Sequence, residues 1–330
     1  MVKESPKRIE WIDTAKGLGL MLVFIGHLHP PYLSTWIYTC HMPLFFFLSG
    51  LVFSTHPFRE FIKKRFLRLI IPYFCLGIVI YLFWAGIYAF ENRPARDYWD
   101  MLSNFLEQRA FWTVWFLAAL FVADVILWFE LFLTKGNKYL AILPSCLIMI
   151  CTFFYYRTGG STLVWCIDVG AVAQFFILLG YIFKSHWERV SQLNLYYLIP
   201  LLFFINIITG YACIKLSGSG LDMSVGLYGN EVLSIISAIS GIFAIIFTCM
   251  QISNRFLRYL GRNTMIFFAW HSRIIIIGCG LLYGALGLFQ SNGLINSILY
   301  TIVTLILILA ILYPITERVK KSQMRKYFGV

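Results

Sequence analysis

The sequence predicts an all-α membrane protein that crosses the bilayer about ten times. Its 330 residues are 60% hydrophobic and 13% charged, whereas soluble domains carry about 25% charged residues. The mean hydropathy is +0.77. A helix needs about twenty apolar residues to cross the hydrocarbon core, and windows of this length recur along the whole chain between short polar segments.

These windows define the candidate membrane spans, which are separated by short polar segments. In chain order they lie at residues 12–29, 36–54, 70–90, 112–133, 139–156, 163–183, 195–213, 231–251, 264–284 and 293–313. We expect one membrane domain over residues 1–330, with no separate soluble domain. An even number of spans places both termini on the same side of the membrane.

The distribution of Lys and Arg predicts that both termini are cytoplasmic. In this orientation twenty of the 27 Lys and Arg residues fall in cytoplasmic segments and five in outer loops, while Lys16 and Arg273 fall within the membrane. Such an asymmetry is the positive-inside pattern. It accounts for the formal net charge of +12 without a nucleic-acid partner, because the composition leaves no room for a soluble basic domain.

Two connections and the cysteines complete the organisation. Residues 57–70 alternate cations with Phe, Ile and Leu, which predicts an amphipathic helix in the cytoplasmic interface. The predicted outer loop from Glu91 to Phe111 is long enough to fold over an entrance. The eight cysteines are scattered and never form a Cys-x-x-Cys pair, so they indicate small buried side chains and predict no metal site.

The first span carries ionisable side chains at both ends. Lys16 and His27 are eleven residues apart, so they share one face of a helix and lie roughly 16 Å apart along its axis. In a structural interpretation, Asp13 and Lys16 pair at the headgroup level and His27 lies at the outer interface. In a functional interpretation this face lines a reaction channel, with His27 as general base and Lys16 drawing in a phosphate-bearing donor.

The second span contains the segment from His41 to Gly50, in which Pro43 predicts a bend near the outer end. Ser49 and Gly50 are typical of close helix packing. His41 lies at the same predicted depth as His27. Either histidine can serve as the base, and spacing favours His27 modestly.

Several segments spread along the chain resemble acyltransferase family 3, and most closely its branch of sugar O-acetylases similar to fucose 4-O-acetylase. The resemblance rests on RIEWIDTAKGLGLMLVFIGH, HMPLFFFLSG, RFLRLIIPY, WFLAALF and LGRNTMIFFAWH, in this order along the chain. It implies transfer of an acyl group, usually acetyl, from cytoplasmic acyl-CoA to a hydroxyl of a glycan or glycolipid on the other side of the membrane. It also implies a bacterial inner or plasma membrane enzyme that modifies a polysaccharide of the cell envelope.

The resemblance also implies roles for particular residues. His27 matches the family's catalytic histidine, and Lys16 stands where many members have Arg. The family's Arg-x-x-Arg motif, implicated in handling CoA, matches Arg65 and Arg68. Independently of the family, Arg65, Arg68, Lys63 and Lys64 form a cluster that suits a nucleotide phosphate, although anionic lipid headgroups and the positive-inside pattern explain Lys63 and Lys64 equally well.

The resemblance leads to a mechanism in which His27 deprotonates the acceptor hydroxyl, which then attacks the thioester of acetyl-CoA. An acyl-histidine intermediate is the alternative. The acceptor residues are expected in the glycine-rich outer segment 217–231, where a carboxylate can bind sugar hydroxyls and an aromatic ring can stack on a sugar; the same segment can equally be a flexible loop. The candidates there are Asp222, Tyr228, Asn230 and Glu231.

A transporter or flippase for a polar or anionic solute is the competing function. Charged side chains within the predicted spans would form its pathway, or would pair with one another for structural reasons. These are Lys16, Asp124, Asp168 and Arg273. The chain shows no convincing pair of matched halves with Pro or Gly breaks, which a transporter would favour.

Overall fold

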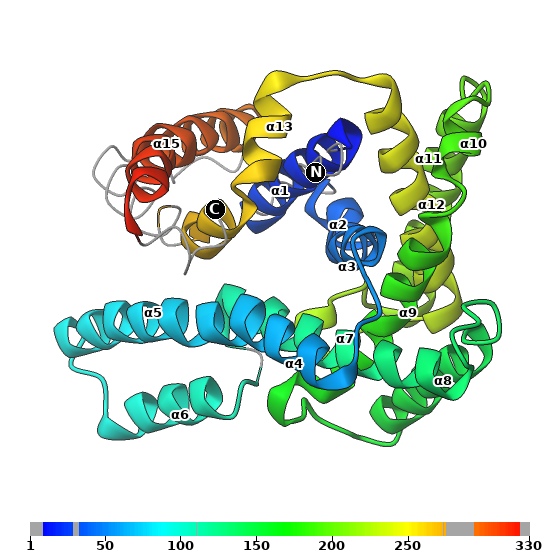
Figure 1. Cartoon of the computed structure of the whole chain (residues 1–330). Coiled ribbons are helices and arrows are strands. Elements are labelled where there is room, and N and C mark those ends of the chain that lie inside the picture. The colour runs from blue at the N-terminus through cyan, green and yellow to red at the C-terminus, as the bar shows by residue number, and fades with distance from the viewer. Residues whose placement is uncertain (1–8, 29–32, 110, 273, 275–293, 324–330) are drawn as a thin grey trace, which may run out of the picture.

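The computed structural model describes residues 9–28, 33–109, 111–272, 274 and 294–323. Within this part of the chain the secondary structure is helical, apart from an isolated β-bridge between Asp222 and Leu227. Figure 1 shows the helices arranged around a central group formed by the first three. The prediction of an all-α protein is confirmed.

The described residues form a series of α-helices. In chain order they are α1 (Glu10–His27), α2 (Leu33–Tyr38), α3 (His41–Leu51), α4 (Phe58–Arg65), α5 (Ile71–Phe90), α6 (Ala95–Leu106), α7 (Trp115–Leu133), α8 (Ile142–Arg157), α9 (Ile167–Phe183), α10 (Trp187–Ser191), α11 (Leu198–Ser217), α12 (Glu231–Gln251), α13 (Arg255–Arg262) and α15 (Leu294–Lys321). A further helical segment covers residues 264–272. Of the rest of the ninth predicted span, Ile274 is described, while Arg273 and residues 275–284 lie outside the described residues.

Six helical segments of the described chain are long and apolar enough to cross a membrane. They are Phe58–Phe90, Trp112–Leu133, Val164–Phe183, Leu198–Ser217, Glu231–Gln251 and Ile298–Lys321. α8 is also apolar but shorter. The protein is therefore a multi-pass membrane protein, and the total of ten crossings stays a prediction.

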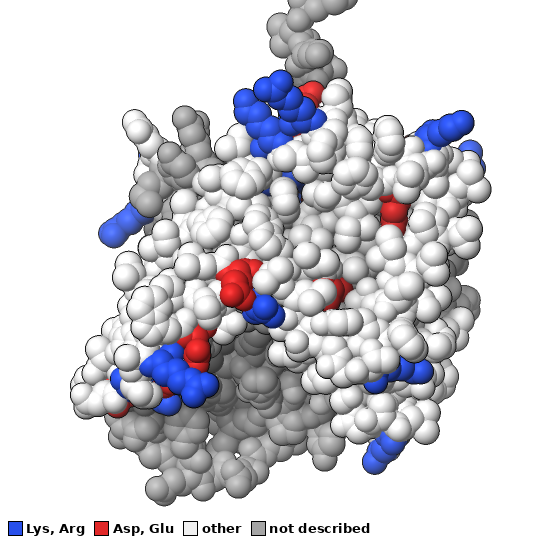
Figure 2. Space-filling view, turned by 90° about the horizontal axis from the view of Figure 1, so that it is seen from below, with Lys and Arg blue, Asp and Glu red and all other residues white. Residues whose placement is uncertain are grey.

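The outward faces of several helices are apolar. On α8, Leu143, Leu147, Ile150 and Phe154 recur every three or four residues, and each is at least 58% exposed. This spacing places them on one face of the helix, and lipid is the surrounding that such a face requires. Most of the molecular face in Figure 2 is likewise uncharged, with charged side chains in a few small clusters.

The second predicted span, 36–54, is two helices rather than one bent helix. α2 ends at Tyr38 and α3 begins at His41, with a turn at Thr39 and Cys40. Pro43 therefore lies in the first turn of α3, where a missing N–H costs nothing because no helical partner exists for it. The chain breaks before the proline instead of bending at it.

The predicted interfacial helix, 57–70, is not a separate element. α4 runs through a π-helical turn at Phe66–Ile70 into α5, so residues Phe58–Phe90 form one helix of 33 residues. The wider turn directly precedes Pro72, which has no N–H to donate to the preceding turn. The apolar and amphipathic segments therefore share one axis.

The predicted outer loop from Glu91 to Phe111 contains a helix, α6, which folds back along α5. The hydroxyl of Tyr73 on α5 donates to the carbonyl of Phe105 on α6 at 2.9 Å, and the two rings stack with centroids 5.7 Å apart. Figure 1 shows α5 and α6 as a pair at the edge of the molecule. The loop is thus part of the helical body.

Glycines bring the central helices into backbone contact. A Cβ on Gly17 of α1 would lie 1.9 Å from the carbonyl oxygen of Leu257 on α13, and one on Gly261 would lie 1.9 Å from that of Asp13. α3 and α9 cross in the same way at Gly50. Small residues at such crossings let helices pack without side chains between them, so α13 fixes α1 and α9 fixes α3.

We expect replacement of Gly50 by alanine to destabilise the protein. The new Cβ would lie 2.0 Å from the carbonyl oxygen of Ile177, and because both partners are backbone, two helices must separate. Overpacking of this kind costs about 1–3 kcal/mol. Thermal unfolding in detergent measures it. The control is Gly86→Ala on α5, where nothing lies within 4 Å; equal melting temperatures for the two variants would contradict a tight α3–α9 crossing.

Candidate active site

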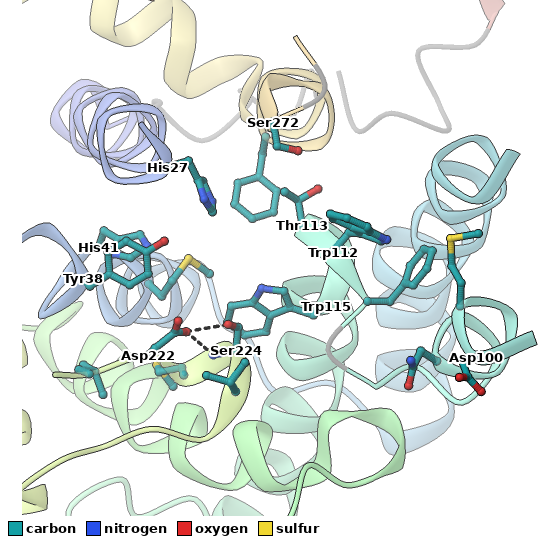
Figure 3. A pocket seen from close by; sticks show the side chains of 18 of the residues that line it. His27, Tyr38, His41, Asp100, Trp112, Thr113, Trp115, Asp222, Ser224 and Ser272 are labelled. Atoms are coloured by element: carbon teal, nitrogen blue, oxygen red, sulfur yellow. Dashed lines mark hydrogen bonds between the residues drawn. The ribbon is translucent and has the colours of Figure 1, made fainter. Parts of the chain in front are cut away.

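A cavity of about 810 Å³ lies at the His27 end of α1. Its walls come from α1, the end of α2, the start of α3, α5, α6, the segment that leads into α7, the loop before α12 and the helical segment 264–272 (Figure 3). Among the residues that line it are His27, Tyr38, His41, Tyr88, Asp97, Asp100, Asn104, Trp112, Thr113, Trp115, Asp222, Ser224, Phe268 and Ser272. The cavity thus combines ionisable, hydroxyl and aromatic groups.

His27 is the last residue of α1 and projects into the cavity (Figure 3). Its ring centroid lies 5.0 Å from that of His271. His271 is fully buried, and its Nδ1 lies 2.8 Å from the carbonyl oxygen of Phe268. A carbonyl only accepts hydrogen bonds, so Nδ1 of His271 carries a proton and donates it in this contact.

His41 lies on the same cavity and is 5% exposed. Its Nδ1 lies 2.9 Å from the carbonyl oxygen of Ile37, which assigns the proton to Nδ1 by the same reasoning. Tyr38 lies between the two histidines, with its ring centroid 4.9 Å from His41 and 6.4 Å from His27. The structure therefore brings both predicted base candidates to one cavity, and the choice between them stays a prediction.

The other end of α1 is held by cations of α13. Arg262 Nε lies 3.1 Å from Asp13 Oδ2, and Arg258 pairs with Glu10. The structural interpretation had Asp13 paired with Lys16; the structure shows Arg262 as an ion-pair partner of Asp13. Lys16 is half-buried on α1, between this end and His27. Its predicted contact with the acyl donor stays a prediction.

Arg65 pairs with a buried carboxylate. Its Nε lies 3.2 Å from Oδ2 of Asp124, which is fully buried. The guanidinium carbon also lies 5.5 Å from the ring centroids of both Phe53 and Phe61. Arg65 therefore supports the packing of α4 against α7, in addition to any role toward CoA.

The other two predicted donor residues are exposed. Lys64 Nζ lies 2.6 Å from Oε1 of Glu60, one turn earlier on α4. Arg68 lies in the π-helical turn and is exposed to the surroundings. Arg68 is thus the member of the predicted Arg-x-x-Arg pair whose side chain is open to a ligand.

Of the four predicted acceptor residues, Asp222 lines the cavity. Its Oδ1 accepts bonds from the backbone N–H and the hydroxyl of Ser224, at 3.0 and 2.6 Å. These two bonds fix the carboxylate at the start of the short turn 223–225. Figure 3 shows Asp222 and Ser224 on the wall opposite His27 and Ser272.

The other three acceptor candidates lie elsewhere. Tyr228 is buried beside Phe153 and Tyr156, and this burial raises the pKa of its hydroxyl. Asn230 caps α12 by accepting from the N–H of Leu233 at 3.1 Å. These contacts give Tyr228 and Asn230 packing and capping roles.

Glu231 forms a salt bridge at the start of α12. Its carboxylate accepts bonds from Nε and Nη2 of Arg157 at 2.6 and 2.5 Å. A bidentate pair of this type ties the ends of α8 and α12 together. Glu231 is thus paired with Arg157 and is not among the residues that line the cavity.

A sequence profile described as an acyltransferase domain, that of acyltransferase family 3, matches residues 9–317. The chain belongs to acyltransferase family 3. No curated protein and no solved structure matches the chain. Family membership and the apolar helices together support a multi-pass membrane acyltransferase.

The cavity is also lined by residues that were not among the candidates from the sequence. Asp97 and Asp100 come from α6, Trp112 from the short helical turn Trp112–Val114, and Trp115 from the start of α7. Trp112 has a φ of 47°, a left-handed conformation that is an outlier for a bulky residue and tends to occur at functional sites. The sequence feature that pointed to this part of the cavity was the loop from Glu91 to Phe111, which is predicted to fold over an entrance.

Proposed function

We propose that the protein is a membrane O-acyltransferase that transfers an acetyl group from cytoplasmic acetyl-CoA to a hydroxyl of an extracytoplasmic or lipid-linked glycan, with His27 as general base. The observation that carries this proposal is the position of His27. It lines a cavity of about 810 Å³ that holds carboxylates, hydroxyls and tryptophans, in a chain of acyltransferase family 3. Such a mixed lining suits a polyhydroxyl acceptor.

In this proposal the acyl donor binds at the opposite end of α1. With the termini in the cytoplasm, Lys16 and the exposed Arg68 and Lys64 lie where the phosphates of CoA would arrive. A phosphopantetheine arm is long enough to follow α1 over the roughly 16 Å from Lys16 to His27. The thioester then reaches the acceptor while the nucleotide stays on the cytoplasmic side.

The chemistry uses groups of the cavity. The neutral His27 ring takes the proton of the acceptor hydroxyl as the oxygen attacks the thioester carbonyl. The carbon–sulfur bond breaks, the acetyl ester forms, and the imidazolium returns its proton to the departing CoA thiolate. A path through an acetyl-histidine on His27 gives the same products, and His41 is the alternative base.

Transfer by the purified protein tests the proposal. We expect the full chain in lipid nanodiscs to release CoA from labelled acetyl-CoA and to deposit the label on glycans extracted from membranes of cells that make it. Mass spectrometry of surface glycans should show an acetyl group that is lost without the gene. If the protein bound CoA but neither experiment gave an acetylated product, the proposed O-acetyltransferase activity would be contradicted. The transporter or flippase would then be the favoured function.

A further inference from the structure

The charges on the cavity wall have one sign. Three carboxylates line it, from Asp97, Asp100 and Asp222, while the described residues of the lining include no Lys or Arg. Two of these carboxylates have cationic neighbours just outside the cavity: Arg93 Nη1 lies 3.8 Å from Asp97 Oδ2, and Arg96 Nε lies 3.6 Å from Asp100 Oδ2. Arg93 also pairs with Glu91, its Nε lying 2.9 Å from Oε2, so the arginines offset part of the negative charge on the α6 wall.

Asp222 differs from these two. The polar contacts of its carboxylate are bonds from the N–H and hydroxyl of Ser224, both to Oδ1, and neither brings a positive charge. The Asp222 carboxylate faces the cavity on the wall opposite His27 (Figure 3). It can accept hydrogen bonds from hydroxyl groups of a ligand, and it repels a ligand that carries negative charge.

Trp112 offers a flat apolar surface on the same cavity. Its ring is stacked on Trp84, with centroids 4.2 Å apart and an interplanar angle of 10°, and the residue is 37% exposed. One ring face is thus supported by Trp84 while the side chain lines the cavity. The left-handed backbone of Trp112 fixes this placement at a conformational cost.

We propose that the accepting group of the glycan is an uncharged sugar, which stacks on Trp112 and donates hydroxyl hydrogen bonds to Asp222, and that Asp222 excludes anionic sugars. This inference rests on the proposed function. An uncharged sugar fits better than an amino sugar, because Arg93 and Arg96 already lie beside Asp97 and Asp100. Within the described lining, Asp222 is the carboxylate without a cationic partner. An aromatic surface with a few polar groups suits the C–H face and hydroxyls of such a ring.

The position of the label on the native product tests the class of acceptor. Glycans labelled by the full chain from acetyl-CoA are hydrolysed under conditions that preserve the ester, and the acetylated sugar is identified by mass spectrometry. We expect the label on an uncharged sugar. Label on a uronic acid, a phosphorylated sugar or an amino sugar would overturn the inference while leaving the O-acyltransferase intact, whereas label on no sugar would contradict the proposed function.

Asp222→Asn tests the exclusion of anions, because asparagine keeps the shape and can still accept from Ser224. Phenyl β-glucoside and phenyl β-glucuronide, which differ by one carboxylate, are compared as inhibitors of native transfer. In the wild type we expect the glucoside to inhibit at least about tenfold better, since like charges brought together cost several kcal/mol. Asp222→Asn should bring the two inhibition constants within about threefold. Equal inhibition of the wild type would overturn the inference.

Matched controls separate these effects from general damage. Glu107→Gln removes a carboxylate that pairs with Arg109 outside the cavity lining, and it should preserve the wild-type preference.

Trp112→Ala should raise the KM for the native acceptor about tenfold or more with the KM for acetyl-CoA unchanged, and Trp112→Phe should recover part of this loss. Trp99→Ala, on the exposed side of α6, should change neither constant; an unchanged acceptor KM in Trp112→Ala would overturn the stacking role.

Discussion

Replacing His27 by alanine should lower the rate of acetyl transfer by about 10²–10⁴-fold, the contribution typical of a positioned general base. The imidazole lies at the end of α1, in the cavity proposed to hold the acceptor, and no alanine side chain can take the hydroxyl proton. The measurement is the release of CoA from acetyl-CoA with saturating acceptor. Thermal stabilisation by acetyl-CoA should persist, because the predicted donor contacts lie at the other end of the helix.

Two other histidines serve as controls for this prediction. His56 lies next to α4, 3.9 Å from Glu60, and His56→Ala should transfer at the wild-type rate. His41→Ala decides between the base candidates, because His41 shares the cavity with His27. A His27→Ala variant with wild-type activity, together with an inactive His41→Ala variant, would assign the base to His41.

Much of the fold follows from composition and the length of apolar runs, since lipid requires helices and about twenty apolar residues per crossing. The positions at which helices end within an apolar run could not be predicted from composition and run length. Residues 36–54 read as one apolar run, yet the helix ends at Tyr38 and begins again at His41, because the first turn of a helix tolerates Pro43 better than its interior. Conversely, residues 57–70 read as a separate helix, but a π-helical turn lets it continue through Pro72.

The site was predictable where it depends on helical periodicity and unpredictable where it depends on long-range packing. The depth of His27 and His41 follows from their distances along the first two apolar runs, and both line one cavity. Asp222 was among the acceptor candidates, but its loop neighbours Tyr228 and Asn230 are directed to other partners by the packing of α8 and the start of α12. No local pattern reveals that Trp112 stacks on Trp84, because this contact depends on how α5 meets the short turn that precedes α7.

The pairing of Arg65 with Asp124 gives the second large expected effect. Arg65→Gln should destabilise the protein by about 3–5 kcal/mol, because it leaves the carboxylate of Asp124 buried without its cation. Asp124→Asn removes that charge, so the double variant Arg65→Gln/Asp124→Asn should unfold within about 1 kcal/mol of the wild type. Thermal or denaturant unfolding of the four proteins in one detergent forms the cycle that isolates the pair.

The same four proteins separate packing from donor binding. If Arg65 also contacts a phosphate of CoA, the double variant regains stability while its KM for acetyl-CoA stays about tenfold or more above the wild-type value, since a charge-assisted hydrogen bond contributes about 1.5–3 kcal/mol. Arg68→Gln is the matched variant, because Arg68 is exposed and should raise the same KM with little change in stability. A double variant that regains both stability and the wild-type KM would restrict Arg65 to neutralising Asp124, and the donor phosphates would then depend on Arg68 and its lysine neighbours.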